Sequence, residues 1–565
     1  MLGTRERYYG VLGILAAQVL LLVWALTQNR HQLNPDGIAY LRLAGYYAEG
    51  PHHLAVSGYW GPLLSWMIAV GLKLGLDPLG AARAAMALSA IGYGVGCLVL
   101  LQTLGLPATA CRAGFGLAAL ATVAWSVEYT SPDLLVAGLI CLATAATVRP
   151  AWTAGWRPPL LAGALWGTAY YAKAVALPYG LGVVLLVVGL RGLLDRAAIR
   201  AALRGGALSL LACGLVVSPW IATLSAKYGA FTVSTSAGAA HAVVGPEDVD
   251  RYHPYARTFH HPEPGRLTAW EDPTSLPYAA WSPFASTRNF RHQLTVAAHN
   301  AVTVWQLLGQ FDLLHLGVLS ATGVLLGWIA GRGKRTVRAG KPRPANRVSP
   351  AGPAFAEAGN PAPDSTGRLP FALLVPLLLA GLGGVYLPAY LGLVDQRYFY
   401  AALPLLFGAA ARAAAWLRGW LIPRSPGLAR VLGPLLLISF GAPALLNAGL
   451  SLGGLPNPAA QLARVLADRI QQAGRAGPVA GSGMILGNRT GLFTAWYLGE
   501  PWLGDEIDAT SEGFHASGAR WILVAARRPV TAQLNQDRRF RDRTPEWLDA
   551  RTAGNPPIRV FEVVE

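Results

Sequence analysis

The chain has 565 residues, of which 53% are hydrophobic and 13% are charged, and its mean hydropathy is +0.38. These values exclude an ordinary soluble protein, and repeated apolar runs of about 18 residues or more predict several membrane crossings. The net charge of +17 does not indicate nucleic-acid binding, because Arg and Lys cluster in short loops between apolar runs, where they orient membrane spans. The four cysteines lack metal-binding spacing, so we interpret them as small core residues.

The first apolar run, at about 9–27, follows Arg5 and Arg7. No small-residue cleavage site follows it, so we expect a retained first span rather than a removed signal peptide. With both arginines in the cytoplasm, the span delivers the chain to the outer side of the membrane. Asp36, just beyond the span, is therefore expected outside.

A short helix is predicted directly after this span. Asn34 suits the N-cap and Pro35 the first helical position, which places Asp36 in the first turn, where the helix dipole favours a carboxylate. Because the residues separate into two faces, we expect the helix to lie in the plane of the membrane interface. The simpler interpretation is that Asp36 only starts the helix. The two faces are Asp36, Tyr40, Leu43 and Tyr47, and Ile38, Leu41, Gly45 and Ala48.

The segment 61–76 is short for a span and suits an interfacial or re-entrant position equally well. The positive-inside rule favours a segment that does not cross, because a crossing would place the Arg-rich loop at 191–204 outside. We therefore expect about eleven spans. The first is followed by spans at about 84–104, 113–130, 134–147, 158–172, 174–190, 205–224, 301–329, 370–390, 398–416 and 431–451.

The spans belong to a predicted transmembrane domain over 1–452. It has outer loops at 29–83 and 226–300 and a cytoplasmic linker at 331–368, which is basic, rich in Pro, Gly and Ala, and expected to be disordered.

Residues 453–565 are more polar and are expected to form a small extracytoplasmic α/β domain. The predicted fold class is thus an α-helical polytopic membrane protein with a small C-terminal α/β domain. Its patterns predict a helix over Ala459–Gln472 and strands at Val479–Ala480, Trp521–Val524 and Val560–Val564.

This topology places four charged residues at span ends on the outer side, namely Asp36, Asp133, Lys173 and Arg397. A charge within hydrocarbon costs about 2.5–3.5 kcal/mol and is usually paired or functional, although at a span end it can reach water. Simpler explanations are a helix-start role for Asp133, an interface anchor for Lys173 and a bridge between Arg397 and Asp395. The convergence of two acids and two bases is more informative than any one of them.

The order of these motifs resembles that of the GT-C superfamily of integral-membrane glycosyltransferases, particularly the branch of protein O-mannosyltransferases and the lipid A aminoarabinose transferase. The shared features cover most of 1–420. The family often has Lys-Pro-Pro or Tyr-Pro-Pro before the second aromatic, where this chain has Tyr-Trp-Gly-Pro. The motifs lie at Pro35 to Tyr40, Gly58 to Leu64, Pro132-Asp133, Gly163 to Lys173 and Arg397 to Pro404.

The resemblance implies a GT-C fold and a sugar donor carried on polyprenyl phosphate. A carboxylate at the outer interface can take the proton of an acceptor hydroxyl, and cations can stabilise the phosphate that leaves. We expect Asp36 to be the general base, and Asp133 to orient the acceptor or, as the alternative, to help hold a divalent cation. The expected substrate-binding residues are Lys173, Arg397, Tyr40, Tyr59, Trp60, Tyr398 and His53.

The leading hypothesis is an inverting glycosyltransferase of the cytoplasmic (inner) membrane, with its C-terminus outside. Its acceptor would be a hydroxyl group of a lipid, a glycan or a protein, and membrane lipids would surround it. We expect no nucleic-acid partner and no cofactor, apart from the divalent cation left open above. One alternative is a metal site in the 226–300 loop, formed by His253, His260, His261 and Glu263. No helical His pair or Cys accompanies them, so we favour a solvated loop over the catalytic cavity.

The rival hypothesis is a transporter or flippase of a lipid-linked or polar solute. Transporters tend to place ionisable residues near the bilayer midplane, often in repeated halves. In this sequence the charges sit at span ends on one side and no internal repeat is evident, which favours the enzyme.

Overall fold

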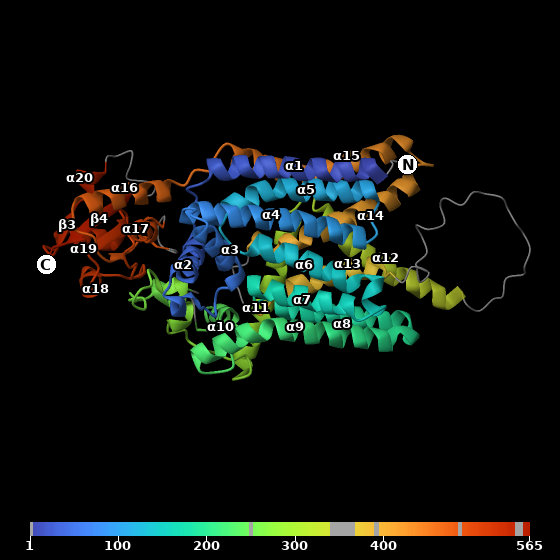
Figure 1. The fold of residues 1–565 in the computed structure, drawn as a ribbon, viewed down its shortest axis with the longest axis horizontal. Helices are drawn as coiled ribbons and strands as arrows, with labels where there is room; N and C mark the ends of the chain where they lie inside the picture. Colours follow the sequence, from blue (N-terminus) through green and yellow to red (C-terminus); the bar gives the residue numbers. More distant parts are fainter. Residues whose placement is uncertain are drawn as a thin grey trace, which may run out of the picture.

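Long helices lie side by side in a bundle, with the C-terminal region beyond one end and the N-terminus at the other (Figure 1). The computed structural model describes residues 4–247, 252–338, 368–388, 395–483, 489–548 and 557–564. The bundle helices are α1 (Thr4–Gln28), α4 (Pro78–Thr103), α5 (Ala108–Glu128), α6 (Asp133–Val148), α7 (Arg157–Ala172), α8 (Ala176–Leu194), α9 (Ile199–Tyr228), α11 (Thr287–Gly309), α12 (Leu316–Arg338), α13 (Phe371–Gly384), α14 (Leu403–Leu421) and α15 (Pro426–Leu452).

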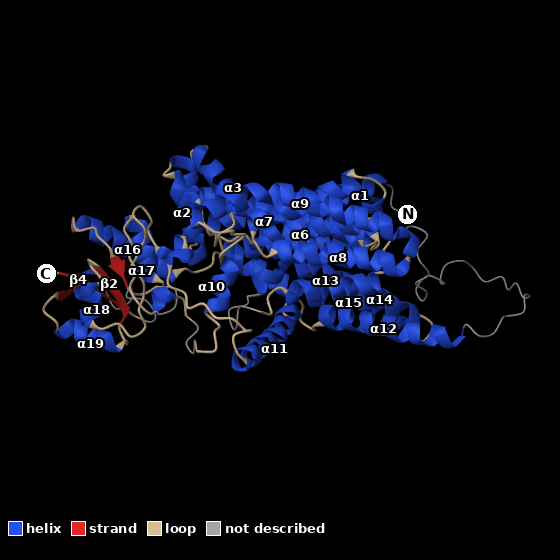
Figure 2. Ribbon diagram, turned by 90° about the horizontal axis from the view of Figure 1, so that it is seen from below, coloured by secondary structure: helices blue, strands red, loops and turns tan. Residues whose placement is uncertain are grey.

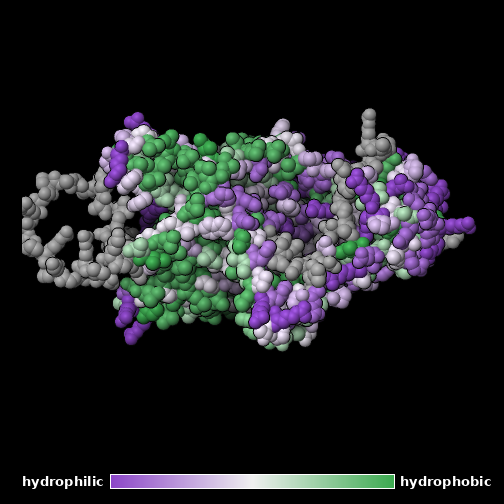
Figure 3. Space-filling model, turned by 180° about the vertical axis from the view of Figure 1, so that it is seen from behind, coloured by the Kyte–Doolittle hydropathy of each residue, from purple (hydrophilic) through white to green (hydrophobic). Residues whose placement is uncertain are grey.

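The bundle has the character of a multi-pass membrane protein. In the described parts of the chain, seven helical segments are long and apolar enough to cross a membrane, and four shorter helical segments are also apolar. On the face shown in Figure 3, large patches of hydrophobic residues lie on the bundle, and hydrophilic residues gather over the C-terminal region. This confirms the predicted polytopic class, while the number of crossings stays a prediction.

One predicted span is interrupted. The single span expected at 301–329 is wrong, because α11 ends at Gly309 and α12 begins at Leu316. The buried carboxylate of Asp312 accepts the backbone N–H groups of Leu316 at 2.6 Å and Gly317 at 3.1 Å. These N–H groups would otherwise bond to carbonyls of a continuous helix, so the carboxylate ends one helix and caps the next.

The expected cytoplasmic linker also begins later than predicted. Helix α12 continues to Arg338, so residues 331–338 are helical. The remainder of the linker, at 339–367, lies outside the described residues.

Two short helices lie at the end of the bundle that faces the C-terminal region (Figure 1). Helix α2 (Pro35–Glu49) begins as predicted, and α3 (Pro62–Lys73) has 12 residues, too few to cross a membrane as a helix. Asn34 stands at the N-cap of α2, but its side chain instead accepts the backbone N–H of Thr130 at 2.9 Å. Both predicted faces of α2 are covered by protein, since Tyr40 and Ile38 are at most 2% exposed.

The remaining elements of the membrane part are short. Single turns of 3-10 helix position several loops, and α10 is the only α-helix between α9 and α11 in the described residues. The elements are η1 (His52–Ala55), η2 (Pro150–Thr153), η3 (Arg196–Ala198), α10 (Ser236–Ala242), η4 (Pro254–Ala256), η5 (Ala269–Glu271), η6 (Pro273–Ser275) and η8 (Gln396–Ala402).

The C-terminal region contains a four-stranded mixed sheet packed with helices (Figure 2). Its strand order is β1-β2-β4-β3, with β1 and β2 parallel and the other pairs antiparallel. This confirms the predicted helix and the three predicted strands to within about two residues. The elements are α16 (Pro458–Gln472), β1 (Val479–Ala480), α17 (Thr490–Leu498), α18 (Ser511–Ala516), β2 (Trp521–Ala525), α19 (Pro529–Gln536), β3 (Phe540–Asp542), α20 (Thr544–Trp547) and β4 (Ile558–Val563).

Candidate active site

Four charged side chains from four separate elements meet at the end of the bundle that faces the C-terminal region. Asp36 lies in the first turn of α2, Asp133 begins α6, Lys173 follows the last residue of α7 and Arg397 lies in η8. Each is at or beside the end of a helix, where the chain enters or leaves the bundle. The structure thus brings together the two acids and two bases that the sequence placed at one level.

Ion pairs join these groups into one cluster. Lys173 donates through Nζ to Oδ1 of Asp133 at 2.6 Å, and Arg397 donates through Nη2 to Oδ2 of Asp36 at 3.0 Å. The Nε atom of Arg397 is 3.6 Å from Oδ2 of Asp133, so the guanidinium lies between both carboxylates. The Asp133 side chain is 3% exposed and that of Asp36 is 21% exposed. Asp36 is therefore the carboxylate that a substrate can reach more readily.

Asp395 also contacts Arg397, as the simpler interpretation expected. Its side chain caps η8 by accepting the backbone N–H of Arg397 at 3.1 Å, and its Oδ2 is 3.7 Å from Nε. The contact is local and holds the turn. The guanidinium nevertheless reaches past it to Asp36, so the two interpretations of Arg397 are both present in the structure.

Aromatic rings support the two cations. The Lys173 ammonium lies 3.9 Å from the centre of the Tyr398 ring, and the Arg397 guanidinium lies 4.8 Å from the centre of the Tyr129 ring. Cations over aromatic faces are stabilised most when they are shielded from water. Among the described residues, Nη1 of Arg397 is buried and has no hydrogen-bond partner. It is a donor available to an anionic ligand.

An aromatic wall, made of Tyr40, Tyr59, Trp60 and Trp270, adjoins Asp36. Trp60 lies 5.1 Å from Tyr40 and 4.7 Å from Tyr59, measured between ring centres. The indole N–H of Trp60 donates to the backbone carbonyl of Trp270 at 2.8 Å, and that of Trp270 points to Oδ1 of Asp36 at 3.4 Å. Both ends of the Asp36 carboxylate are thus oriented, one by a guanidinium and one by an indole.

Trp270 and Tyr129 were missed by the sequence analysis. Trp270 is 234 positions away from Asp36, in a long loop with no regular pattern, so no local signal marked it. Tyr129 lies four positions before Asp133 but carries no charge to single it out. His53, which was expected to contact substrate, is exposed in η1, and within the described residues no hydrogen bond or ion pair joins it to the cluster.

Buried acids hold the Trp270 loop against the bundle. Glu271 is fully buried and accepts the Tyr46 hydroxyl of α2 at 2.7 Å. Burial raises the pKa of the Glu271 carboxyl, and the neighbouring Arg42 opposes that rise. On the other side, Asp272 accepts Lys227 at 2.5 Å and the Tyr228 hydroxyl at 3.0 Å, both from the end of α9. The loop is therefore tied to α2 and α9 on either side of Trp270.

His253 belongs to the same loop. Burial lowers the pKa of its imidazole to about 4, and its Nδ1 atom hydrogen-bonds with the Tyr278 hydroxyl at 2.6 Å. Its ring centre is 4.9 Å from that of Trp270. Among the described residues no group of three or more His, Cys, Asp or Glu side chains is arranged to hold a metal ion. The expectations about metals remain predictions.

The bundle and its C-terminal sheet together have a fold similar to that of ArnT, which agrees with the resemblance that the motifs indicated. ArnT from Cupriavidus metallidurans bound to undecaprenyl phosphate has a TM-score of 0.53 and 17% identity, covering 98% of both chains. Its apo structure matches with the same TM-score and coverage at 16% identity. The Archaeoglobus fulgidus oligosaccharyltransferase in the apo form matches with a TM-score of 0.47 and 10% identity over 91% of this chain and 69% of that one.

No family model and no curated protein matches the sequence. At these identities, likeness to solved structures establishes the fold alone. The activity is therefore argued from the site.

Proposed function

We propose that this protein is an inverting glycosyltransferase that moves a sugar from a polyprenyl-phosphate donor to a hydroxyl acceptor on the outer face of the cytoplasmic membrane. The observation that carries the proposal is the cluster of Asp36, Lys173 and Arg397 at the end of an apolar bundle. The ArnT fold supports it, because one ArnT structure holds undecaprenyl phosphate. In this topology the C-terminal region is extracytoplasmic.

The reaction proceeds by one displacement at the anomeric carbon. The acceptor oxygen bonds to that carbon on the face opposite the phosphate, and the acceptor proton passes to the Asp36 carboxylate. The bond from the carbon to the phosphate oxygen breaks, and its electron pair leaves with the phosphate. Cations placed where this charge develops lower the barrier, which is the role of Arg397 and Lys173.

Arg397 can serve the base and the leaving group together. A guanidinium carries five N–H donors in a planar fork. Nη2 is bonded to Asp36, whereas Nη1 is buried and without a hydrogen-bond partner in the described chain. A phosphate at Nη1 therefore leaves the bond to Asp36 in place, so binding the donor does not disturb the base.

Asp133 acts as a positioning residue in this scheme. One of its oxygens accepts Lys173 and the other faces Arg397, so its charge is directed at the two cations. It keeps both cations at the same end of the bundle while they are partly desolvated. This role differs from the acceptor contact or cation ligand expected for Asp133, which remain alternatives.

The charges of the cluster lie at helix ends, which favours an enzyme over a transporter with a site at the bilayer midplane. The test is to incubate purified protein with a radiolabelled polyprenyl-phosphate sugar and membrane-envelope acceptors. We expect a new glycosidic bond with inverted anomeric configuration. A product with retained anomeric configuration would rule out the single-displacement mechanism. Sugar crossing vesicle membranes without any bond formed would support the transporter instead.

A further inference from the structure

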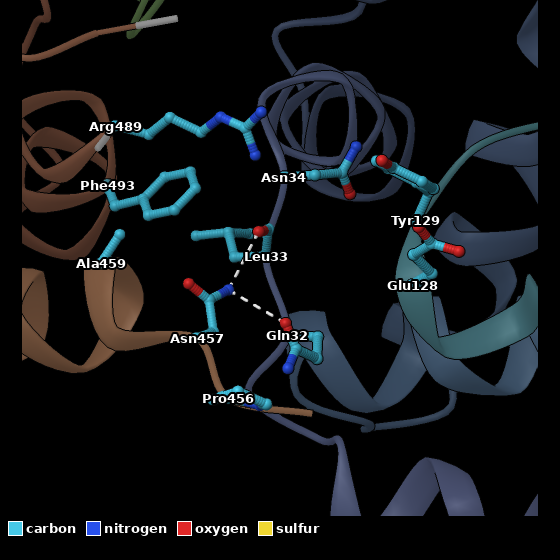
Figure 4. Close-up of a pocket in the computed structure, with 10 residues that line it drawn as sticks. All are labelled: Gln32, Leu33, Asn34, Glu128, Tyr129, Pro456, Asn457, Ala459, Arg489 and Phe493. Atoms are coloured by element: carbon cyan, nitrogen blue, oxygen red, sulfur yellow. Dashed lines mark hydrogen bonds between the residues drawn. The ribbon is translucent and has the colours of Figure 1, made fainter. Parts of the chain in front are cut away.

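A cavity of about 320 Å³ lies between the bundle and the C-terminal region (Figure 4). Pockets for small ligands typically start at about 300 Å³, so this one has room for a compact polar group. Asn34, Glu128 and Tyr129 line its bundle side. Arg489 and Phe493, from the start of α17, line the opposite side. A ligand in this cavity would touch both parts of the chain.

The cavity is built around polar groups. Asn457 donates through Nδ2 to Oε1 of Gln32 at 3.1 Å and to the carbonyl of Leu33 at 3.2 Å, which joins the two walls below the cavity. The side-chain oxygen of Asn34 accepts the backbone N–H of Thr130, and within the described chain its NH₂ group remains a donor for a ligand. The Asn34 amide offers a hydrogen bond to a hydroxyl group, while the Phe493 ring adds an apolar surface.

Arg489 and Glu128 bring opposite charges to the cavity. In the part of the chain that the structure describes, neither forms an ion pair, although both line the same space. Arg489 also has a backbone φ of +69°, a region that non-glycine residues adopt rarely and at a cost. Strained residues of this kind cluster at ligand sites, and Arg489 lines this cavity.

The cavity adjoins the proposed active site. Tyr129, in its wall, carries the Arg397 guanidinium on its ring, and that guanidinium is bonded to Asp36. Asn34, in the same wall, stands two positions before Asp36. A molecule held in the cavity therefore lies one side chain away from the groups that react.

We infer that this cavity is the acceptor subsite, and that it takes a hydroxyl-rich group bearing a phosphate. Arg489 pairs with the phosphate, while the amide of Asn34 and the carboxylate of Glu128 bind hydroxyls. The inference rests on the proposed function, since it names the class of acceptor for that same site. It also gives the C-terminal region a role, because Arg489 comes from that region.

The test measures binding to the full-length protein in nanodiscs, with glucose 1-phosphate, glucose and undecaprenyl phosphate as separate probes. We expect wild type to bind glucose 1-phosphate more tightly than glucose. Arg489→Gly should weaken glucose 1-phosphate binding about tenfold and leave undecaprenyl phosphate binding unchanged. Glycine adopts positive φ without strain, so this variant should melt no lower than wild type. Arg469→Gln, on the exposed side of α16, is the matched control and should bind all probes as wild type does.

Two results would overturn the acceptor subsite. One is equal binding of glucose 1-phosphate by wild type and Arg489→Gly. The other is a loss of undecaprenyl phosphate binding in that variant, which would assign the phosphate of the donor to the cavity. If wild type binds glucose 1-phosphate through Arg489 but does not bind undecaprenyl phosphate, the cavity stands and the donor named under the proposed function fails.

Discussion

Replacing Glu271 with alanine should detach the Trp270 loop from helix α2. The Glu271 carboxylate is fully buried and accepts the backbone N–H groups of Leu267 and Thr268 at 2.8 and 3.2 Å and the Tyr46 hydroxyl at 2.7 Å. Without it the two backbone N–H groups lose a charged acceptor, and hydrogen bonds to charged groups contribute about 1.5–3 kcal/mol each. The Tyr46 hydroxyl can still donate to the Gly265 carbonyl at 2.8 Å. We expect the free energy that docks the loop to fall by at least about 3 kcal/mol, which raises the population of the detached loop about a hundredfold.

Hydrogen exchange of the amides at 267–272 measures this docking directly. The rates should rise about a hundredfold in Glu271→Ala, and turnover of the proposed transfer should fall because Trp270 leaves Asp36. Glu271→Gln should recover part of both, since its amide oxygen still accepts. Glu247→Ala is the matched control, because that acid is 81% exposed and pairs with Arg288, itself 69% exposed. Unchanged exchange at 267–272 in Glu271→Ala would refute the reasoning.

Three further outcomes follow from the site. Arg397→Lys keeps the positive charge but loses the planar set of N–H donors of the guanidinium. The rate of transfer in a steady-state assay should therefore fall about a hundredfold or more while Asp36 stays in place, and activity near wild type would contradict this. Lys173→Met leaves the buried Asp133 with one cation and should lower the free energy of unfolding by about 3–5 kcal/mol, seen as a lower melting temperature. An unchanged melting temperature would show that the Lys173–Asp133 pair does not stabilise the fold. The pKa of His253 is lowered to about 4 from 6.5, so the unfolded chain binds a proton there more readily than the folded chain. The resulting contribution of about 3 kcal/mol to the free energy of unfolding is complete above pH 6.5 and is lost as the pH falls toward 4. His253→Gln should therefore flatten the fall in melting temperature over that window, and a fall as steep as that of wild type would contradict the assignment.

Local patterns predicted the elements whose signals lie within a few residues. Helix α2 begins at Pro35 and β2 begins at Trp521, as expected. The break between α11 and α12 was missed because apolar content continues across it. What ends the helix is the buried carboxylate of Asp312, and hydropathy alone does not reveal a side chain that caps N–H groups four and five residues ahead.

The candidate site could be predicted in part for a different reason. Asp36, Asp133, Lys173 and Arg397 each stand out as a charge at the end of an apolar run, and topology alone puts such charges at one level. Their pairing could not be predicted. That Lys173 pairs with Asp133 while Arg397 reaches Asp36, 361 positions away, is decided by helix packing.

The measurement that tests the account most directly compares wild type with Asp36→Asn for transfer of a radiolabelled sugar from undecaprenyl phosphate. The substitution keeps the shape of the side chain and removes its ability to take a proton. We expect transfer to be lost while the purified variant folds and binds undecaprenyl phosphate as wild type does. Near-normal transfer by Asp36→Asn would contradict the account, because no base would then be needed at that position.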